Sequence, residues 1–193
     1  MFRRPDALVA VIVLSTATVL GAGCSDNTQQ PPRITFTSEI TRGTHSAADC
    51  PENTPWLMIG SFGNPADPTQ PVTPVDTGAS FGQGTASVDC SVTAAGGGFD
   101  IKATASLTGA QGGAFTIQGH VTATGDQPNQ SITTSYDQRP YTEQDCTVTF
   151  ASTGEAVAAG RIWADFDCPN SADASLQRTC ETKGTFRFEN CAQ

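Results

Sequence analysis

The sequence predicts an all-β protein: an antiparallel β-sandwich held by disulfides, with the jelly roll as one form such a sandwich can take. Two observations favour this class. Apolar and polar residues alternate with a period of two along much of the chain, which is typical of strands with one buried face. The chain also contains 19 glycines and 12 prolines, and turn-like clusters separate the alternating segments. Only residues 171–178 favour one or two helical turns instead.

The clearest strands are expected at residues 86–93, 99–108 and 115–122. Within each strand, apolar residues alternate with residues that are mostly hydroxyl-bearing or charged. The short connections 94–98 and 109–113 are rich in glycine, which suits tight turns between antiparallel neighbours. This part of the chain therefore predicts a three-stranded antiparallel meander with one buried face and one solvated face.

Further strands are expected on both sides of this meander. The segments are 34–40, 56–62, 146–150, 158–168 and 184–191. Two other stretches, 63–84 and 124–143, contain several prolines and no clear alternation. We expect both to be long irregular loops, which in compact domains are either functional or mobile.

The first 23 residues have the features of a signal peptide. Arg3 and Arg4 give a basic start. Residues 7–20 are apolar apart from Ser15, Thr16 and Thr18, and this run is shorter than the roughly 20 residues that a membrane-spanning helix needs. Small residues at 21–23 lead directly to Cys24. The sequence therefore predicts an exported protein.

The stretch Gly21-Ala22-Gly23-Cys24 resembles the lipobox of bacterial lipoproteins. The resemblance implies that Cys24 receives a diacylglycerol on its sulfur, that the signal is cut before Cys24, and that the new amino group is acylated. Two or three acyl chains would hold the protein at a membrane, whereas a single chain binds only marginally. Simple secretion is the alternative, because Gly21 and Gly23 also fit ordinary signal cleavage.

Residues 24–32 then predict a polar tether, and residues 33–193 predict a single β-sandwich domain. In the lipoprotein family, an aspartate directly after the acylated cysteine retains a protein at the inner membrane of Gram-negative cells. Ser25 takes that place here. The resemblance therefore implies the exported side of the bacterial cell envelope, at the outer membrane if the cell is Gram-negative.

The chain has seven cysteines, and setting Cys24 apart leaves an even number. The remaining six are Cys50, Cys90, Cys146, Cys168, Cys180 and Cys191. An exported domain favours paired cysteines because a leftover thiol is reactive, so we predict three disulfides. Many pairings are possible; the one we expect joins Cys168 to Cys180, Cys50 to Cys90, and Cys146 to Cys191.

The charge balance excludes one class of partner. The formal net charge is -9, and without Arg3, Arg4 and Asp6 there remain 8 basic and 18 acidic residues. An acidic surface repels phosphate backbones, so we expect no nucleic-acid partner.

No catalytic, metal or cofactor site is expected. The chain lacks the G-x-S-x-G motif, and His45, Ser46 and Asp49, although close in sequence, are more typical of a solvated loop. There is no C-x-x-C motif, and the only other histidine is His120. The acidic stretch from Asp165 to Asp173 lacks the spacing of a calcium-binding EF-hand loop.

Four residues are candidate ligand contacts: Trp163, Tyr136, Arg139 and Tyr141. Trp163 is expected on the polar face of its strand, where it would contact a sugar or a partner unless a loop covers it. The other three lie in the second predicted loop, and tyrosine and arginine suit binding surfaces. We therefore expect a membrane-anchored domain that binds an envelope protein or acts structurally. A glycan-binding module is the alternative, and a hydrolase is less favoured.

Overall fold

The computed structural model describes residues 30–44, 50–51, 53–64, 66–109, 112–136, 139–150 and 154–193. These residues form twelve β-strands and no helix. The strands are β1 (Arg33–Thr41), β2 (Asn53–Ile59), β3 (Val75–Asp76), β4 (Ser80–Phe81), β5 (Gly84–Ala95), β6 (Gly98–Leu107), β7 (Gly113–Val121), β8 (Gln127–Tyr136), β9 (Arg139–Thr149), β10 (Ala156–Ala158), β11 (Arg161–Asp173) and β12 (Arg178–Glu189). The all-β prediction is confirmed. The helical turns expected at 171–178 are wrong, because β11 runs to Asp173, residues 174–177 form the turn of a hairpin, and β12 begins at Arg178.

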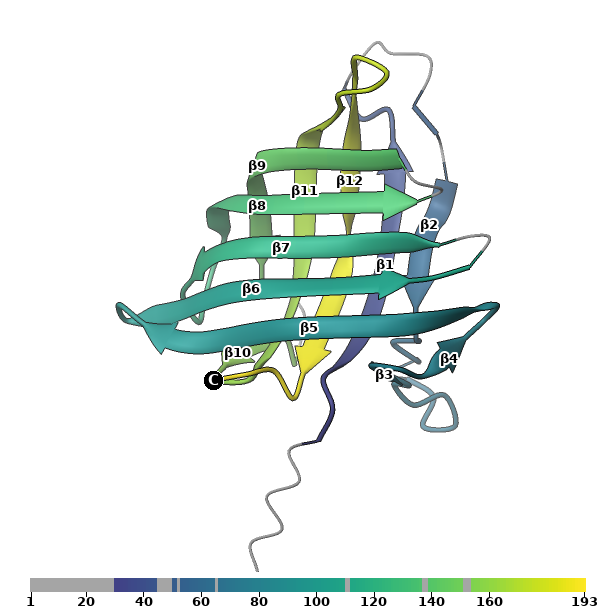
Figure 1. The fold of residues 1–193 in the computed structure, drawn as a ribbon. Coiled ribbons are helices and arrows are strands. Elements are labelled where there is room, and N and C mark those ends of the chain that lie inside the picture. The colour runs from purple at the N-terminus through teal and green to yellow at the C-terminus, as the bar shows by residue number, and fades with distance from the viewer. Residues whose placement is uncertain are drawn as a thin grey trace, which may run out of the picture.

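The strands form one antiparallel sheet that folds over on itself into two layers (Figure 1). The sheet order is β2-β1-β12-β11-β9-β8-β7-β6-β5-β4. In Figure 1, β5 to β9 run across the front, and β1, β2, β11 and β12 run behind them at a steep angle. The result is a sandwich of crossed layers whose sheet nearly closes into a barrel. The order is mainly that of a meander, without the two Greek keys of a jelly roll.

No helix within the described ranges is long and apolar enough to cross a membrane.

The predicted meander is confirmed. β5 pairs with β6 over ten residue pairs, and β6 pairs with β7 over nine. The apolar residues of the predicted alternation face the interior. The buried ones are Ala86, Val88, Cys90, Val92, Ile101, Ala103, Ala105, Phe115, Ile117 and Val121. Their neighbours along each strand lie on the outer face of the front layer, where most are exposed.

Strand β9 turns the corner between the layers, since it pairs with β8 on one side and with β11 on the other. The β8–β9 register shifts twice between Gln127 and Ile132, where Pro128 lies and where Asn129 has a φ of 62°. Such bulges bend a strand and increase its twist. The irregular loop expected at 124–143 is therefore wrong: the segment forms most of a hairpin whose bulge hides the alternation.

Five phenylalanines join the layers. Phe115 on β7 is the one contributed by the front layer, and it is fully buried. Its ring centroid lies 4.5, 5.2, 5.3 and 6.1 Å from those of Phe36, Phe166, Phe186 and Phe188 of the back layer. Aromatic pairs at these separations add to the gain from burying apolar area. The centre of the core is therefore one front-layer ring set among four back-layer rings.

All six cysteines of the domain are paired, as predicted, but the predicted pairing is wrong. The disulfides are Cys50–Cys180, Cys90–Cys191 and Cys146–Cys168. Short separation in sequence favoured a bond between Cys168 and Cys180, and these do lie on neighbouring strands. However, a register shift sets Cys168 opposite Thr182 and Cys180 opposite Ser171. Cys168 instead bonds across to β9, on the other side of β11.

The C-terminal residues close the free edge of β5. The Ala192 amide donates to the Cys90 carbonyl at 2.8 Å, and the Val92 amide donates to the Ala192 carbonyl at 2.9 Å. The Val92 carbonyl accepts a bond of 2.9 Å from the Gly160 amide. The Cys90–Cys191 disulfide fixes the tail beside the strand. Since unpaired strand edges invite pairing with other chains, this contact protects β5.

Replacing Phe115 with alanine should lower the free energy of unfolding by about 3–5 kcal/mol, because it leaves a cavity among four rings. Chemical denaturation of the oxidised protein measures this loss. Gln118→Ala, on the exposed face of the same strand, is the control and should cost less than about 1 kcal/mol. Equal losses in the two variants would contradict the central role of Phe115.

Candidate functional site

Three of the four candidate contacts lie on the β8–β9 hairpin. Tyr136 pairs with Arg139 at its end, and Arg139 is exposed. The side chain of Tyr136 lies outside the described residues. Tyr141 is 0% exposed, so its side chain offers no surface to a ligand. The expectation that Tyr141 contacts a ligand is therefore wrong.

Tyr141 instead packs in a small second core with Ile40, Trp56 and the Cys50–Cys180 disulfide. The Trp56 ring meets it edge to face, with centroids 5.3 Å apart. The Arg178 guanidinium lies 5.5 Å from the centre of the Tyr141 ring. Burial raises the pKa of the Tyr141 hydroxyl. These contacts make Tyr141 a support behind Trp56.

Trp163 lies on the outward face of β11, as predicted, but neighbouring residues cover it. The Phe62 ring stacks on it with centroids 6.2 Å apart and planes 20° apart. The Arg187 guanidinium lies 5.2 Å from the centre of the indole ring. The hollow beside these residues measures about 150 Å³, below the 300–1,000 Å³ typical of ligand sites. Trp163 is therefore packed by its neighbours, and it is not an open platform for a sugar.

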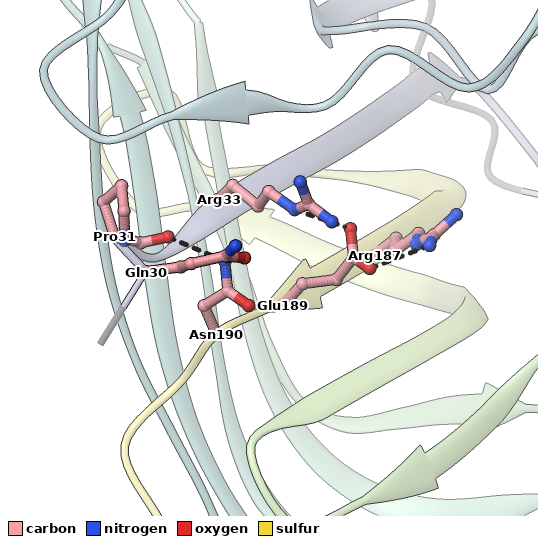
Figure 2. A network of polar contacts seen from close by, with 6 residues as sticks. All are labelled: Gln30, Pro31, Arg33, Arg187, Glu189 and Asn190. Carbon is pink, nitrogen blue, oxygen red and sulfur yellow. Dashed lines mark hydrogen bonds and ion pairs between the residues drawn. The ribbon is translucent and has the colours of Figure 1, made fainter. Parts of the chain in front are cut away.

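Arg187 belongs to a polar network where β1 and β12 meet (Figure 2). The Glu189 carboxylate accepts from Arg33 Nε at 3.0 Å and from Arg187 Nη2 at 2.8 Å. Burial raises the pKa of Glu189, but the hydrogen bonds and charges of the two arginines outweigh it and hold that pKa below its ordinary value. Beside this network, the Asn190 side-chain amide donates to the Pro31 carbonyl at 3.0 Å. The network ties the start of the domain to its last strand.

One group of side chains has the spacing of metal ligands without their chemistry. Ligand atoms of Glu143, Cys146 and Cys168 lie within 4.8 Å of one another. The two sulfurs form a disulfide, and Glu143 Oε2 accepts a bond of 2.7 Å from the Asn170 amide. Since metal binding by cysteine requires a thiolate, this group is not a metal centre.

The other polar candidates do not form a site. Asp165 and Asp167 lie on the outward face of β11, whereas Asp173 is buried at its end, so these acids do not converge. His120 Nδ1 lies 2.8 Å from Asp100 Oδ1 on the exposed face of the front layer. The cluster of His45, Ser46 and Asp49 lies outside the described residues, as does Cys24.

A groove of about 490 Å³ lies between β2 and the segments that face it from the front layer. Its lining residues are Pro55, Trp56, Leu57, Met58, Phe81, Gly82, Gln83, Gly84, Leu107, Thr108 and Gly109. Its volume is that of a typical small-molecule site. None of these residues is charged, although the chain carries a net charge of -9.

The groove has a buried floor and an exposed rim. Trp56 and Leu57 are buried, and Tyr141 supports Trp56 from behind. Met58 is 47% exposed, and it is one of two exposed large hydrophobic residues in the described part of the chain. The methionine side chain is flexible and fits surfaces of different shape.

Hydrogen bonds fix the opposite wall. The Thr85 amide donates to Thr108 Oγ1 at 3.1 Å, and the Thr108 amide donates to the Thr85 carbonyl at 3.1 Å. A side chain at Gly84 would overlap the Thr108 carbonyl, so the close approach requires glycine. Because the walls come from three segments far apart in sequence, the groove could not be found from local patterns. Its one sequence signal is the apolar stretch that begins at Trp56.

Comparison of the chain with protein-family models, with curated proteins and with solved structures found no match.

Replacing Glu189 with glutamine should destabilise the protein at pH 7 by about 1 kcal/mol, because two charge-assisted hydrogen bonds are weakened. A carboxyl whose pKa is lower in the folded state stabilises the protein above its unfolded pKa, and this contribution is lost as the pH falls through its folded pKa. The difference between wild type and variant should therefore shrink as the pH falls below the ordinary value of 4.5.

Denaturation midpoints measured from pH 7 downward check this. Asp89→Asn, on the exposed face of β5, controls for the loss of one negative charge. A stability difference that stays constant, or grows, as the pH falls would contradict the part assigned to Glu189.

Proposed function

We propose that this chain is a lipid-anchored protein of the bacterial cell envelope that works by binding, with Cys24 as its anchor and the groove beside β2 as its binding surface. The observation that carries the anchor is the pairing of the cysteines. Three disulfides use all six cysteines other than Cys24. Cys24 is therefore left without a cysteine partner within the chain. An acylated cysteine must have a sulfur that is not used in a disulfide.

The three disulfides also support an extracytoplasmic location. Structural disulfides persist in oxidising compartments and are rare in the cytosol. The two bonds that close the longest stretches of chain, Cys50–Cys180 and Cys90–Cys191, span separations of 130 and 101 residues. A domain built on such long-range bonds suits the exported side of a membrane. By the resemblance at Ser25, that membrane is the outer one if the cell is Gram-negative.

The position of the tether supports the same arrangement. The described chain starts at Gln30, and the Asn190 side chain bonds to Gln30 and Pro31 beside the last strand. In Figure 1, β1 begins at the same end of the molecule as the C-terminus. An anchor at Cys24 would thus hold the domain by one end and leave its sides accessible to a ligand.

A glycan-binding module is less well supported. It relied on Trp163 and the tyrosines of the β8–β9 segment as stacking platforms. Phe62 and Arg187 cover Trp163, and Tyr141 is buried. The groove beside β2 is the better candidate surface, because it is larger than the hollow beside Trp163 and because Met58 at its rim is exposed.

Cys24→Ala tests the anchor in cells that are fed a fatty acid carrying a clickable tag. We expect the wild-type protein to take up the label and to sediment with membranes, and the variant to remain unlabelled because its acceptor sulfur is gone. Ser25→Ala, which keeps Cys24, is the matched control and should be labelled like wild type. A wild-type protein without label would overturn the proposed anchor.

A further inference from the structure

We propose that the groove beside β2 binds an uncharged lipid, with an acyl chain against its apolar side chains and a hydroxyl-bearing head at its polar rim, as in a monoacylglycerol. The inference deepens the binding role proposed above and rests on it. It names the chemical class of ligand that this groove accepts.

The charge distribution favours an uncharged ligand. In a chain with 19 acidic and 10 basic residues, the eleven described residues that line the groove include no charged side chain. An ionised head group placed there would lose water and gain no counter-charge. The net charge of -9 also repels anions, so fatty acids and anionic phospholipids fit less well than a neutral lipid.

The apolar lining favours an acyl chain. Trp56 and Leu57 form a buried floor, and Phe81 and Leu107 face them from the other wall. Met58 lies nearly half exposed beside this floor, where an apolar ligand would cover it. Each methylene removed from water contributes about 0.8 kcal/mol, so a chain that covers the accessible parts of Met58, Phe81 and Leu107 would supply most of the affinity.

The polar atoms of the rim suit hydroxyl groups. The Gln83 side chain is exposed and has both donors and an acceptor for hydrogen bonds. A side chain at Gly82 would meet no atom within 4 Å, so there is open space beside the turn that carries Gln83. A glycerol head can both donate and accept hydrogen bonds there.

An extended peptide is a poorer occupant, although β2 is the terminal strand of the sheet. A peptide that adds to a sheet edge needs a regular row of backbone donors and acceptors. Pro55 has no amide hydrogen, and the β1–β2 register shifts between Ser38 and Ile40. Both features weaken β2 as a template for another strand.

The two tryptophans of the chain allow a direct test, because Trp56 forms the groove floor and Trp163 lies on the outer face of β11. The protein used is the chain that begins at Ser25, which keeps every described strand and all three disulfides, in buffer without detergent. Trp163→Phe leaves Trp56 as the only tryptophan, and Trp56→Phe leaves Trp163. The probe is a monoacylglycerol with bromine atoms on its acyl chain, which quench a tryptophan that they contact.

We expect saturable quenching of Trp56 and none of Trp163. Met58→Glu should weaken binding by at least about tenfold, because it places a charge against the acyl chain. Leu176→Glu is the matched control: Leu176 is 50% exposed but lies in the β11–β12 turn, and its replacement should change affinity less than about twofold.

Quenching of neither tryptophan, equal quenching of both, or equal effects of the two glutamate variants would overturn the lipid proposal. If Trp56→Phe fails to fold, the comparison of Met58→Glu with Leu176→Glu still decides. None of these results depends on Cys24, which is absent from the protein used. A failure of the lipid proposal is therefore distinct from a failure of the anchor.

Discussion

The arrangement of the two layers depends on the insertion of Phe115 among Phe36, Phe166, Phe186 and Phe188. These four rings come from β1, β11 and β12 of the back layer, so one front-layer side chain sets the contact with three strands behind it. The front layer also contributes small residues to the interior, among them Ala86, Ala103 and Ala105. Small residues let the crossed layers approach closely, and β9 carries the sheet round the corner between them.

A single sheet folded in this way has two terminal edges, and the protein treats them differently. At one end of the sheet, the short strand β4 pairs with the start of β5, and Ala192 and Gly160 close the same edge at Cys90 and Val92, where the Cys90–Cys191 disulfide fixes the tail. At the other end of the sheet, β2 borders a groove whose floor is supported by Tyr141 and by the small core around Cys50–Cys180. The same sheet thus has one edge that is protected and one that borders the groove.

The parts of the fold that the sequence predicted are those with local signals. Alternation identified the β5–β6–β7 meander and placed Trp163 on an outer face. It failed at β8, where Pro128 and Asn129 lie at a bulge, and in the disulfide pairing, where a register shift separates Cys168 from Cys180. The cover of Trp163 by Phe62 and the groove walls arise from contacts between distant segments, for which period and composition carry no signal.

The proposed anchor at Cys24 and the cysteine pairing in the folded domain are tested by one measurement. Protein from the membrane fraction is digested without reductant and its peptides are identified by mass spectrometry. We expect three linked pairs, Cys50–Cys180, Cys90–Cys191 and Cys146–Cys168, and an N-terminal peptide that begins at an acylated Cys24. A Cys24 found as a free thiol, or bonded to one of the other six cysteines, would contradict the account.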